Sequence, residues 1–168
     1  MQGEFKVSVS KDYLVFASAH FITFRGHQCE SLHGHNYRVG VTVEGAVDPE
    51  CAFVVDFAIL KHVVKRLIDP IDHKVLLPTE NPKLRYEERD GKLHVHYFDQ
   101  LQYVFPRGDC ALLPISNTTA EMIAQYLARR VRAELEQAGA DRVTGVEVEV
   151  EESFGQAATY REAAAVLR

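Results

Sequence analysis

Three histidines near the start of the chain have types and spacing suited to metal chemistry. A single glycine separates His33 from His35, so on a β-strand, whose side chains alternate between two faces, both imidazoles point to the same side. His20 lies thirteen residues before His33, at the expected end of another strand. Three neutral imidazoles without a fourth protein ligand are typical of a catalytic Zn²⁺ that keeps one position open. We therefore predict that His20, His33 and His35 bind a metal ion.

Two further groups could move protons. Cys29 lies between the predicted ligands, where a bound cation would favour the thiolate, which can act as a base or a nucleophile. Isolated cysteines are also common as small buried residues, so both interpretations of Cys29 stay open. Asp72 directly precedes His73, and a neighbouring carboxylate can orient an imidazole and raise its basicity for proton transfer near neutral pH. The alternative is that Asp72 and His73 are ordinary polar residues that follow the end of a helix and have no chemical role.

Glu152 is an acidic residue on an expected apolar face. In the strand predicted at about residues 142–153, Val146, Val148 and Val150 share one face, and the same parity places Glu152 on it. A carboxylate there is costly unless it meets a hydrogen-bond donor or a cation. We interpret Glu152 as an anchor for an amidine-like N–H pair, such as the edge of a pterin or guanine; the alternative is a strand end exposed to water.

A second His-x-His pair, His94 and His96, has the same spacing but no third histidine beside it in the sequence. It lies within residues 78–114, whose alternating pattern about the Asp90-Gly91 turn is typical of a β-hairpin. We expect these two histidines to lie on a solvated hairpin face rather than to bind metal. The segment is interpreted as an insertion of strands with no chemistry of its own.

Two strands are expected to position the histidines. Residues 5–20 read as extended, with a change of phase near residues 10–12 that suggests a bulge. Residues 32–45 form the next strand, in which His33 and His35 begin a face that continues as valines. If these strands pair antiparallel, His20 returns beside the other two imidazoles.

Two helices complete the predicted order of two strands, a helix, the β insertion, a helix and a strand. Asp56 is suited to cap a helix over residues 57–68, whose apolar residues have helical periodicity. A second helix is expected where Thr118 and Glu121 have the spacing of a capping box, and Gly139 is its expected end.

Composition narrows the class of protein. The chain has 168 residues, of which 46% are hydrophobic and 26% charged, values usual for one globular domain. The net charge of −5 argues against a nucleic-acid partner, and no apolar run is long enough to span a membrane. Three cysteines without zinc-ribbon spacing, and an N-terminus without the apolar region of a signal peptide, fit a reducing cytosol. We expect a single cytoplasmic domain over residues 1–168 that acts on a small molecule.

Taken together and in order, these motifs resemble the 6-pyruvoyl-tetrahydropterin synthase/6-carboxy-tetrahydropterin synthase family. The matching residues are His20, Cys29-x-x-x-His33-Gly34-His35, Asp56-Phe57, Asp72-His73-Lys74, Thr119-x-Glu121, Glu152 and Tyr160, which cover about residues 12–77 and 115–161. The resemblance implies the α+β tunnelling fold (T-fold), an antiparallel four-stranded sheet with two helices on one side, here with a β-hairpin insertion at about residues 78–114. It also implies a homo-oligomer, a trimer or hexamer with active sites between subunits, in which Asp72 and His73 complete a neighbour's site.

The resemblance further implies a role for each residue. His20, His33 and His35 are the zinc ligands, Cys29 is the general base, and Asp72 with His73 is the proton donor or relay. Glu152 holds the pterin ring of 7,8-dihydroneopterin triphosphate, helped by Thr119 and Glu121.

The implied product depends on the branch of the family. The Cys-x-x-x-His spacing resembles the bacterial enzymes that make 6-carboxy-5,6,7,8-tetrahydropterin, with release of acetaldehyde and triphosphate, for queuosine and deazapurine biosynthesis. The alternatives are 6-pyruvoyl-tetrahydropterin synthase, which eliminates triphosphate, and a non-catalytic pterin- or purine-binding module with a structural metal. Some relatives replace the cysteine with glutamate and cleave the side chain differently, and in this chain Glu30 follows Cys29.

Overall fold

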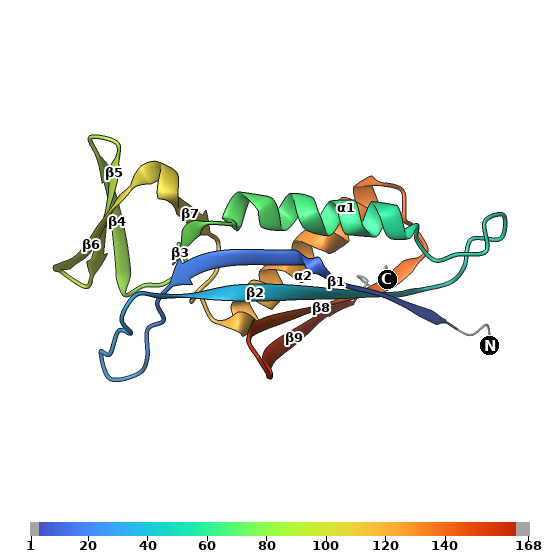
Figure 1. Ribbon diagram of the computed structural model, residues 1–168, viewed down its shortest axis with the longest axis horizontal. Helices are drawn as coiled ribbons and strands as arrows, with labels where there is room; N and C mark the ends of the chain where they lie inside the picture. The colour runs from blue at the N-terminus through green and yellow to red at the C-terminus, as the bar shows by residue number, and fades with distance from the viewer. Residues whose placement is uncertain (1–3, 164–168) are drawn as a thin grey trace.

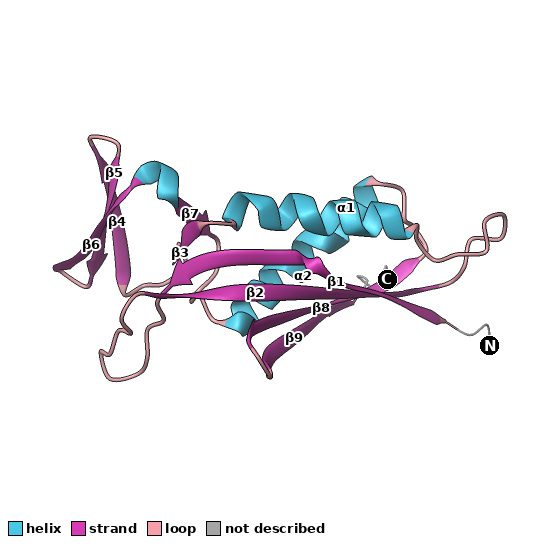
Figure 2. Cartoon of the chain, in the orientation of Figure 1, coloured by secondary structure: helices cyan, strands magenta, loops and turns pink. Residues whose placement is uncertain are grey.

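A six-stranded sheet forms the body of the molecule, and two helices pack on one of its faces (Figures 1 and 2). The computed structural model describes residues 4–163, apart from the side chains of residues 11–13. The strands lie in the order β7 (Cys110–Leu113), β3 (Lys74–Pro78), β1 (Phe5–His20), β2 (His33–Gly45), β8 (Val143–Ser153) and β9 (Gln156–Ala163). The helices are α1 (Phe57–Ile68) and α2 (Ala120–Gln137), and short 3-10 turns cover Asp69–Ile71 and Arg107–Asp109.

The four strands β1, β2, β8 and β9 form the antiparallel sheet that the family resemblance predicted. The register of β1 against β2 shifts between Ser10 and Val15, which confirms the bulge expected from the change of phase. Two short strands extend this sheet: β3 pairs parallel to β1, and β7 pairs parallel to β3. The T-fold is therefore confirmed, with a parallel extension beside it.

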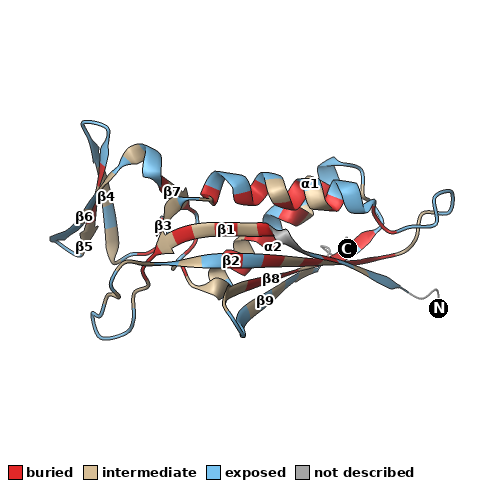
Figure 3. Cartoon of the chain, in the orientation of Figure 1, coloured by how far each residue is buried: buried red, intermediate tan, exposed pale blue. Residues whose placement is uncertain are grey.

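The core lies between the sheet and the helices (Figure 3). Three valine pairs face each other across β2 and β8, in the registers Val39–Val150, Val41–Val148 and Val43–Val146, and all six side chains are buried. The apolar stripes of α1 and α2 pack onto this surface. Burying one such side chain stabilises the fold by roughly 1.5–3 kcal/mol relative to exposure, so the alternation of valines sets which face of the sheet the helices cover.

The two helix starts differ in how well they were predicted. Asp56 caps α1 by accepting a hydrogen bond from Ala58 N–H at 2.7 Å, as expected. The capping box of Thr118 and Glu121 is wrong, because Thr119 caps α2 by accepting from Met122 N–H. The Thr118 hydroxyl is fully buried and instead donates to the carbonyl of Phe21 at 2.8 Å, so a tertiary contact takes it away from the helix.

The insertion is a separate three-stranded antiparallel sheet, β4 (Leu84–Arg89), β5 (Lys92–Tyr97) and β6 (Gln100–Pro106). Its first hairpin turns at Asp90-Gly91, where both residues have positive φ, as the turn signal predicted. His94 and His96 are half-buried rather than fully solvated, because Glu87 and Val104 lie beside His94 on the neighbouring strands.

The inner face of this small sheet forms a second apolar cluster of its own. Leu93 and Val95 are buried there, together with Phe21, Leu77 and Cys110 from the main body. Phe16 of the first cluster and Phe21 of the second lie on either side of His20 along the chain.

Across residues 4–163, neither helix combines the length and the apolar character needed to span a membrane.

Gly45 offers a test of the β2–β8 pairing. It lies at a register shift, and a methyl group on its Cα would overlap the carbonyl oxygen of Arg142 and approach Val54 Cγ1 to 3.0 Å. We expect Gly45→Ala to lower the free energy of unfolding by about 1–3 kcal/mol, measured by urea denaturation. Gly40→Ala is the matched control, since its new methyl group would meet no atom of the described residues closer than 3.8 Å. Equal midpoints for the two variants would contradict the close approach at Gly45.

Candidate metal centre

The three predicted ligands meet at one end of the sheet. The antiparallel register places His20 directly opposite His33, and His35 lies two residues further on the same face of β2. One ring nitrogen from each histidine lies within 4.8 Å of the others. The ring centroids are 4.6 Å apart for His20–His33 and 4.9 Å for His33–His35. The juxtaposition follows from strand pairing alone, as the period-2 spacing predicted.

His20 is held in the form that binds a metal. Its side chain is 2% exposed, and Nδ1 lies 2.7 Å from the carbonyl oxygen of Thr118, so the proton sits on Nδ1 and leaves Nε2 with a free lone pair. Burial lowers the pKa of His20, which keeps the ring neutral. Its Nε2 is buried and makes no hydrogen bond within residues 4–163. Such a group is costly unless it takes a ligand.

The same arrangement recurs at His33, whose Nδ1 lies 2.9 Å from the carbonyl oxygen of Ser31. Three imidazoles, two of them fixed by carbonyl acceptors, are a donor set that suits Zn²⁺ with one position open. The residues therefore fit a metal ion of this type.

Glu152 completes the group from β8. Its Oε1 lies 3.3 Å from His20 Nε2 and 3.8 Å from His35 Nε2, which puts the carboxylate on the side that the strand parity indicated. The Tyr37 hydroxyl donates to the same oxygen at 3.4 Å. Burial, and then the charge of Glu152, raise the pKa of Tyr37, so the phenol stays protonated and can donate. Sequence reasoning gave Tyr37 no role in the site, although it shares the parity of His33 and His35.

A cavity of about 310 Å³ opens beside Glu152. Thr119 and Glu121, at the start of α2, line it together with Glu152, so the three residues predicted to hold a substrate are brought together. The remaining lining residues are Ile22, Ala120 and three residues at the start of β9, namely Gln156, Ala157 and Ala158. The β9 residues were not predicted, because only the β8–β9 pairing brings them to this cavity.

Asp72 and His73 form a pair, but they point elsewhere. Asp72 Oδ1 accepts from Ala17 N–H at 2.8 Å and lies 3.0 Å from His73 Nδ1. The hydrogen bond from Ala17, and then His73, hold the pKa of Asp72 below its usual value. The His73 side chain is 81% exposed, and neither residue is among those described around the Glu152 cavity. The pair is thus fixed on β1 and presented to solvent.

Cys29 and Glu30 lie in the loop between β1 and β2, and their side chains meet different surroundings. Cys29 packs against the second apolar cluster, and burial, followed by the charge of Glu30, raises the pKa of its thiol. Glu30 Oε2 accepts from Ile22 N–H at 3.3 Å and lies 3.8 Å from His33 Nδ1. The carboxylate therefore contacts a predicted metal ligand, whereas the thiol is neutral in this arrangement.

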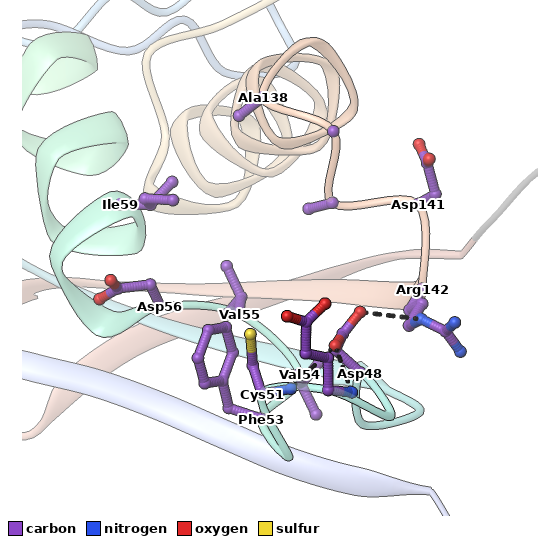
Figure 4. Close-up of a pocket in the computed structure, with 13 residues that line it drawn as sticks. Asp48, Cys51, Phe53, Val54, Val55, Asp56, Ile59, Ala138, Asp141 and Arg142 are labelled. Carbon is purple, nitrogen blue, oxygen red and sulfur yellow. Dashed lines mark hydrogen bonds and ion pairs between the residues drawn. The ribbon is translucent and has the colours of Figure 1, made fainter.

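A larger cavity of about 510 Å³ lies at the other end of β2, beyond Gly45 (Figure 4). Asp48, Phe53, Asp56 and Arg142 line it, and Arg142 Nε lies 3.6 Å from Asp48 Oδ2. None of the predicted site residues lines this cavity, as far as the described residues show. Chemistry rather than cavity size therefore marks the histidine end as the candidate site.

Comparisons with known proteins show which family the chain is similar to. The family model of 6-pyruvoyl tetrahydropterin synthase matches residues 8–163. A putative 6-carboxy-5,6,7,8-tetrahydropterin synthase of Methanocaldococcus jannaschii is 40% identical over 88% of this chain and 90% of its own length. The 6-carboxy-5,6,7,8-tetrahydropterin synthase of Haemophilus influenzae is 34% identical over 74% of this chain and 81% of its own.

Solved structures are similar over nearly the whole chain. The 6-pyruvoyl tetrahydropterin synthase of Plasmodium vivax superposes with a TM-score of 0.89 at 31% identity, over 97% of this chain and 100% of that one. A second structure of the Plasmodium vivax enzyme, in which a catalytic glutamate is replaced by alanine, has the same TM-score at 30% identity over 97% of this chain and 100% of that one.

Metal analysis tests the three-histidine centre. We expect the purified protein to hold about one Zn²⁺ per chain, since such a site takes one ion, measured by mass spectrometry of the metal after dialysis. His33→Ala should lose most of it, because two imidazoles remain. His94→Ala is the matched control, since it removes a histidine of the same His-x-His spacing in the insertion, and it should keep its metal. Loss from both variants, or from neither, would contradict the assignment.

Proposed function

The chain belongs to the 6-pyruvoyl tetrahydropterin synthase family, and from that premise we propose that it is a zinc-dependent lyase of the 6-carboxy-tetrahydropterin branch. Its substrate would be 7,8-dihydroneopterin triphosphate, and its products 6-carboxy-5,6,7,8-tetrahydropterin, acetaldehyde and triphosphate, in queuosine and deazapurine biosynthesis. The observation that carries the proposal is the convergence of three imidazoles, two of which also lie beside the Glu152 carboxylate, next to a cavity. The names of the relatives from Methanocaldococcus jannaschii and Haemophilus influenzae support the branch.

Glu152 is proposed to bind the pterin ring. A carboxylate can accept two parallel N–H bonds from an amidine-like edge, and such charge-assisted pairs are among the stronger hydrogen bonds. The Tyr37 hydroxyl holds one oxygen of Glu152 in place, so the carboxylate is oriented before the substrate arrives. Thr119 and Glu121 would form the wall of the cavity opposite β9.

His20, His33 and His35 are proposed to hold Zn²⁺, and the ion, when bound, would act as a Lewis acid on the side-chain hydroxyls of the substrate and acidify the adjacent C–H. The chain prepares this site without the ion. Thr118 and Ser31 fix the proton of His20 and His33 on Nδ1, and burial keeps His20 neutral.

Proton transfer is assigned to Cys29 and to the Asp72–His73 pair. Cys29 would remove the proton from the substrate side chain, and His73, oriented by Asp72, would supply or relay one. Because His73 is presented to solvent in the single chain, we propose that it completes the site of a neighbouring subunit in a homotrimer or hexamer. The hydrogen bond from Ala17 N–H of β1 to Asp72 supports this, since it holds the carboxylate that lies beside the exposed His73.

A second candidate product is 6-pyruvoyl-tetrahydropterin. The similarity to the Plasmodium vivax 6-pyruvoyl tetrahydropterin synthase favours it, as does the placement of the Glu30 carboxylate beside His33, since a catalytic glutamate is named for that relative. A non-catalytic pterin- or purine-binding module with a structural metal is the alternative of a different class. We further propose a single T-fold domain with the insertion at 78–114 and a cytoplasmic location, which the free state of all three cysteines supports.

Product analysis distinguishes these candidates. With zinc-loaded protein and dihydroneopterin triphosphate, we expect 6-carboxy-tetrahydropterin and acetaldehyde in equal amounts by liquid chromatography and mass spectrometry. Cys29→Ala should keep its zinc and lose turnover by about 10²-fold or more, because it removes the general base. Cys51→Ala, at an exposed cysteine, is the control. Only 6-pyruvoyl-tetrahydropterin would move the assignment to the sister enzyme, and pterin binding without any product would favour the non-catalytic module.

Subunit mixing tests the shared site. Cys29→Ala and His73→Ala proteins should each be inactive, but after co-expression about a quarter of the sites should combine an intact Cys29 with an intact His73 from the neighbour. Mixing Cys29→Ala with Glu152→Gln is the control, because Glu152 contacts His20 of its own chain and no intact site can form. Equal recovery in both mixtures, or none in either, would contradict a site that takes His73 from a neighbour.

A further inference from the structure

Asn117, in the segment between β7 and α2, pairs with the backbone of Thr23 at the start of the loop that carries Cys29. Its Nδ2 donates to the carbonyl of Thr23 at 3.1 Å, and its Oδ1 accepts from Thr23 N–H at 3.2 Å. An asparagine side chain offers the same donor and acceptor as a peptide group. Asn117 therefore occupies the place that a neighbouring strand would take beside Thr23.

Thr23 is also the residue that lies opposite Cys29. An isolated antiparallel bridge joins the two, and the residues on either side of them exchange backbone hydrogen bonds of 2.8 and 2.9 Å. In this kind of antiparallel pair, the N–H and C=O groups of the two opposed residues point outward, away from each other. Thr23 thus presents both of its backbone groups to Asn117, and holding Thr23 also holds the backbone that carries Cys29.

The same asparagine connects the loop to the metal centre. Its Oδ1 also accepts from Thr118 N–H at 3.2 Å. Thr118 is fully buried; its hydroxyl donates to the carbonyl of Phe21 at 2.8 Å, and its own carbonyl oxygen lies 2.7 Å from His20 Nδ1. One side chain therefore joins the Cys29 loop to the residue that fixes the proton of a predicted metal ligand.

Asn81 holds Thr23 from the entry to the insertion. It is buried, and its Nδ2 donates to the Thr23 hydroxyl at 3.0 Å while its Oδ1 accepts from Lys83 N–H at 3.0 Å, just before β4. At the exit of the loop, Leu32 N–H donates to the Tyr103 hydroxyl of β6 at 3.2 Å. Figure 1 shows β4–β6 at the same end of the molecule as the β1–β2 connection. The insertion therefore contacts the loop at both of its ends.

We infer that Asn117 and Asn81 are positioning residues that set the Cys29 loop and the His20 ring relative to each other. Two hydrogen bonds to one residue restrict both rotation and displacement of its backbone, and Asn117 makes them to Thr23 while it also binds the N–H of Thr118. Both asparagines act through other residues. Their effect on turnover rests on the proposed function and their effect on zinc affinity on the proposed metal centre, whereas their hold on the loop depends on neither.

Zinc affinity tests the link to His20. Asn117→Ala removes three hydrogen bonds, and we expect it to weaken zinc binding by the full chain about tenfold, measured by competition with a chelator, because a group that orients a metal ligand is lost. Asn117→Asp keeps the acceptor for Thr118 N–H and should recover part of the lost affinity. Thr79→Val is the matched control, since it removes a side-chain hydrogen bond of 3.0 Å to the backbone just after β3, and it should keep the wild-type affinity. Wild-type affinity in Asn117→Ala, or an equal loss in Thr79→Val, overturns the link.

Hydrogen exchange of the zinc-free chain tests the hold on the loop. In Asn117→Ala and in Asn81→Ala we expect exchange across residues 21–32 to be about tenfold faster, because hydrogen bonds that fix Thr23 are lost. Exchange in β2 and β8 should stay unchanged. Unchanged exchange of the loop in both variants overturns the positioning role. If Asn117→Ala does not fold, Asn81→Ala and Asn117→Asp decide the question in its place.

These outcomes are distinct from those that test the proposed function. A protein that makes no pterin product but shows both effects would refute the lyase activity and support the positioning role of Asn117. A protein that makes the product, and in which Asn117→Ala changes neither zinc affinity nor loop exchange, would keep its proposed function and lose this role.

Discussion

His20 and His33 face each other because β1 and β2 pair antiparallel, and the other parts of the candidate site are placed relative to that pair. Side chains alternate along a strand, so a slip of one residue would turn His33 and His35 to the opposite face and separate them from His20. The bulge between Ser10 and Val15 lets both halves of β1 keep their apolar residues on the core side. The strand register, more than any single contact, brings together the three histidines that could hold a metal ion.

The same face of the sheet carries the core and the site. Along β2 and β8 the paired valines give way at one end to His35, Tyr37 and Glu152, so the apolar layer ends in a cluster of polar groups. The hydrogen bonds among these groups do not pair every polar atom, since His20 Nε2 has no hydrogen-bond partner across residues 4–163. His35 and Glu152 are only partly buried, so the site is open to a ligand. The unsatisfied nitrogen of His20 points to a ligand that the described part of the chain does not itself provide.

The residues of the candidate site pack against two different apolar clusters. The imidazoles and Glu152 lie at the end of the main core, whereas Cys29 packs against the second apolar cluster, to which both the insertion sheet and the main body contribute. Asp72 and His73 are part of neither group, because Asp72 accepts a hydrogen bond from Ala17 N–H of β1. The loop that carries Cys29 is therefore held partly by contacts with the insertion, which lie outside the β1–β2 pairing.

Local sequence by itself determined the long strands β1, β2 and β8, the helix over residues 57–68, the hairpin at Asp90-Gly91 and the common face of His33 and His35, because periodicity, capping and turn preferences act over a few residues. Only the tertiary structure decided what long-range packing controls. The Phe21 carbonyl takes the hydroxyl of Thr118 away from the helix start, β9 brings Gln156 to the cavity, and Tyr103 reaches the Cys29 loop from a segment that the pattern marked as chemically empty. Contacts between residues far apart in the chain depend on how the two apolar clusters pack. A local sequence pattern does not encode which distant residues that packing brings together.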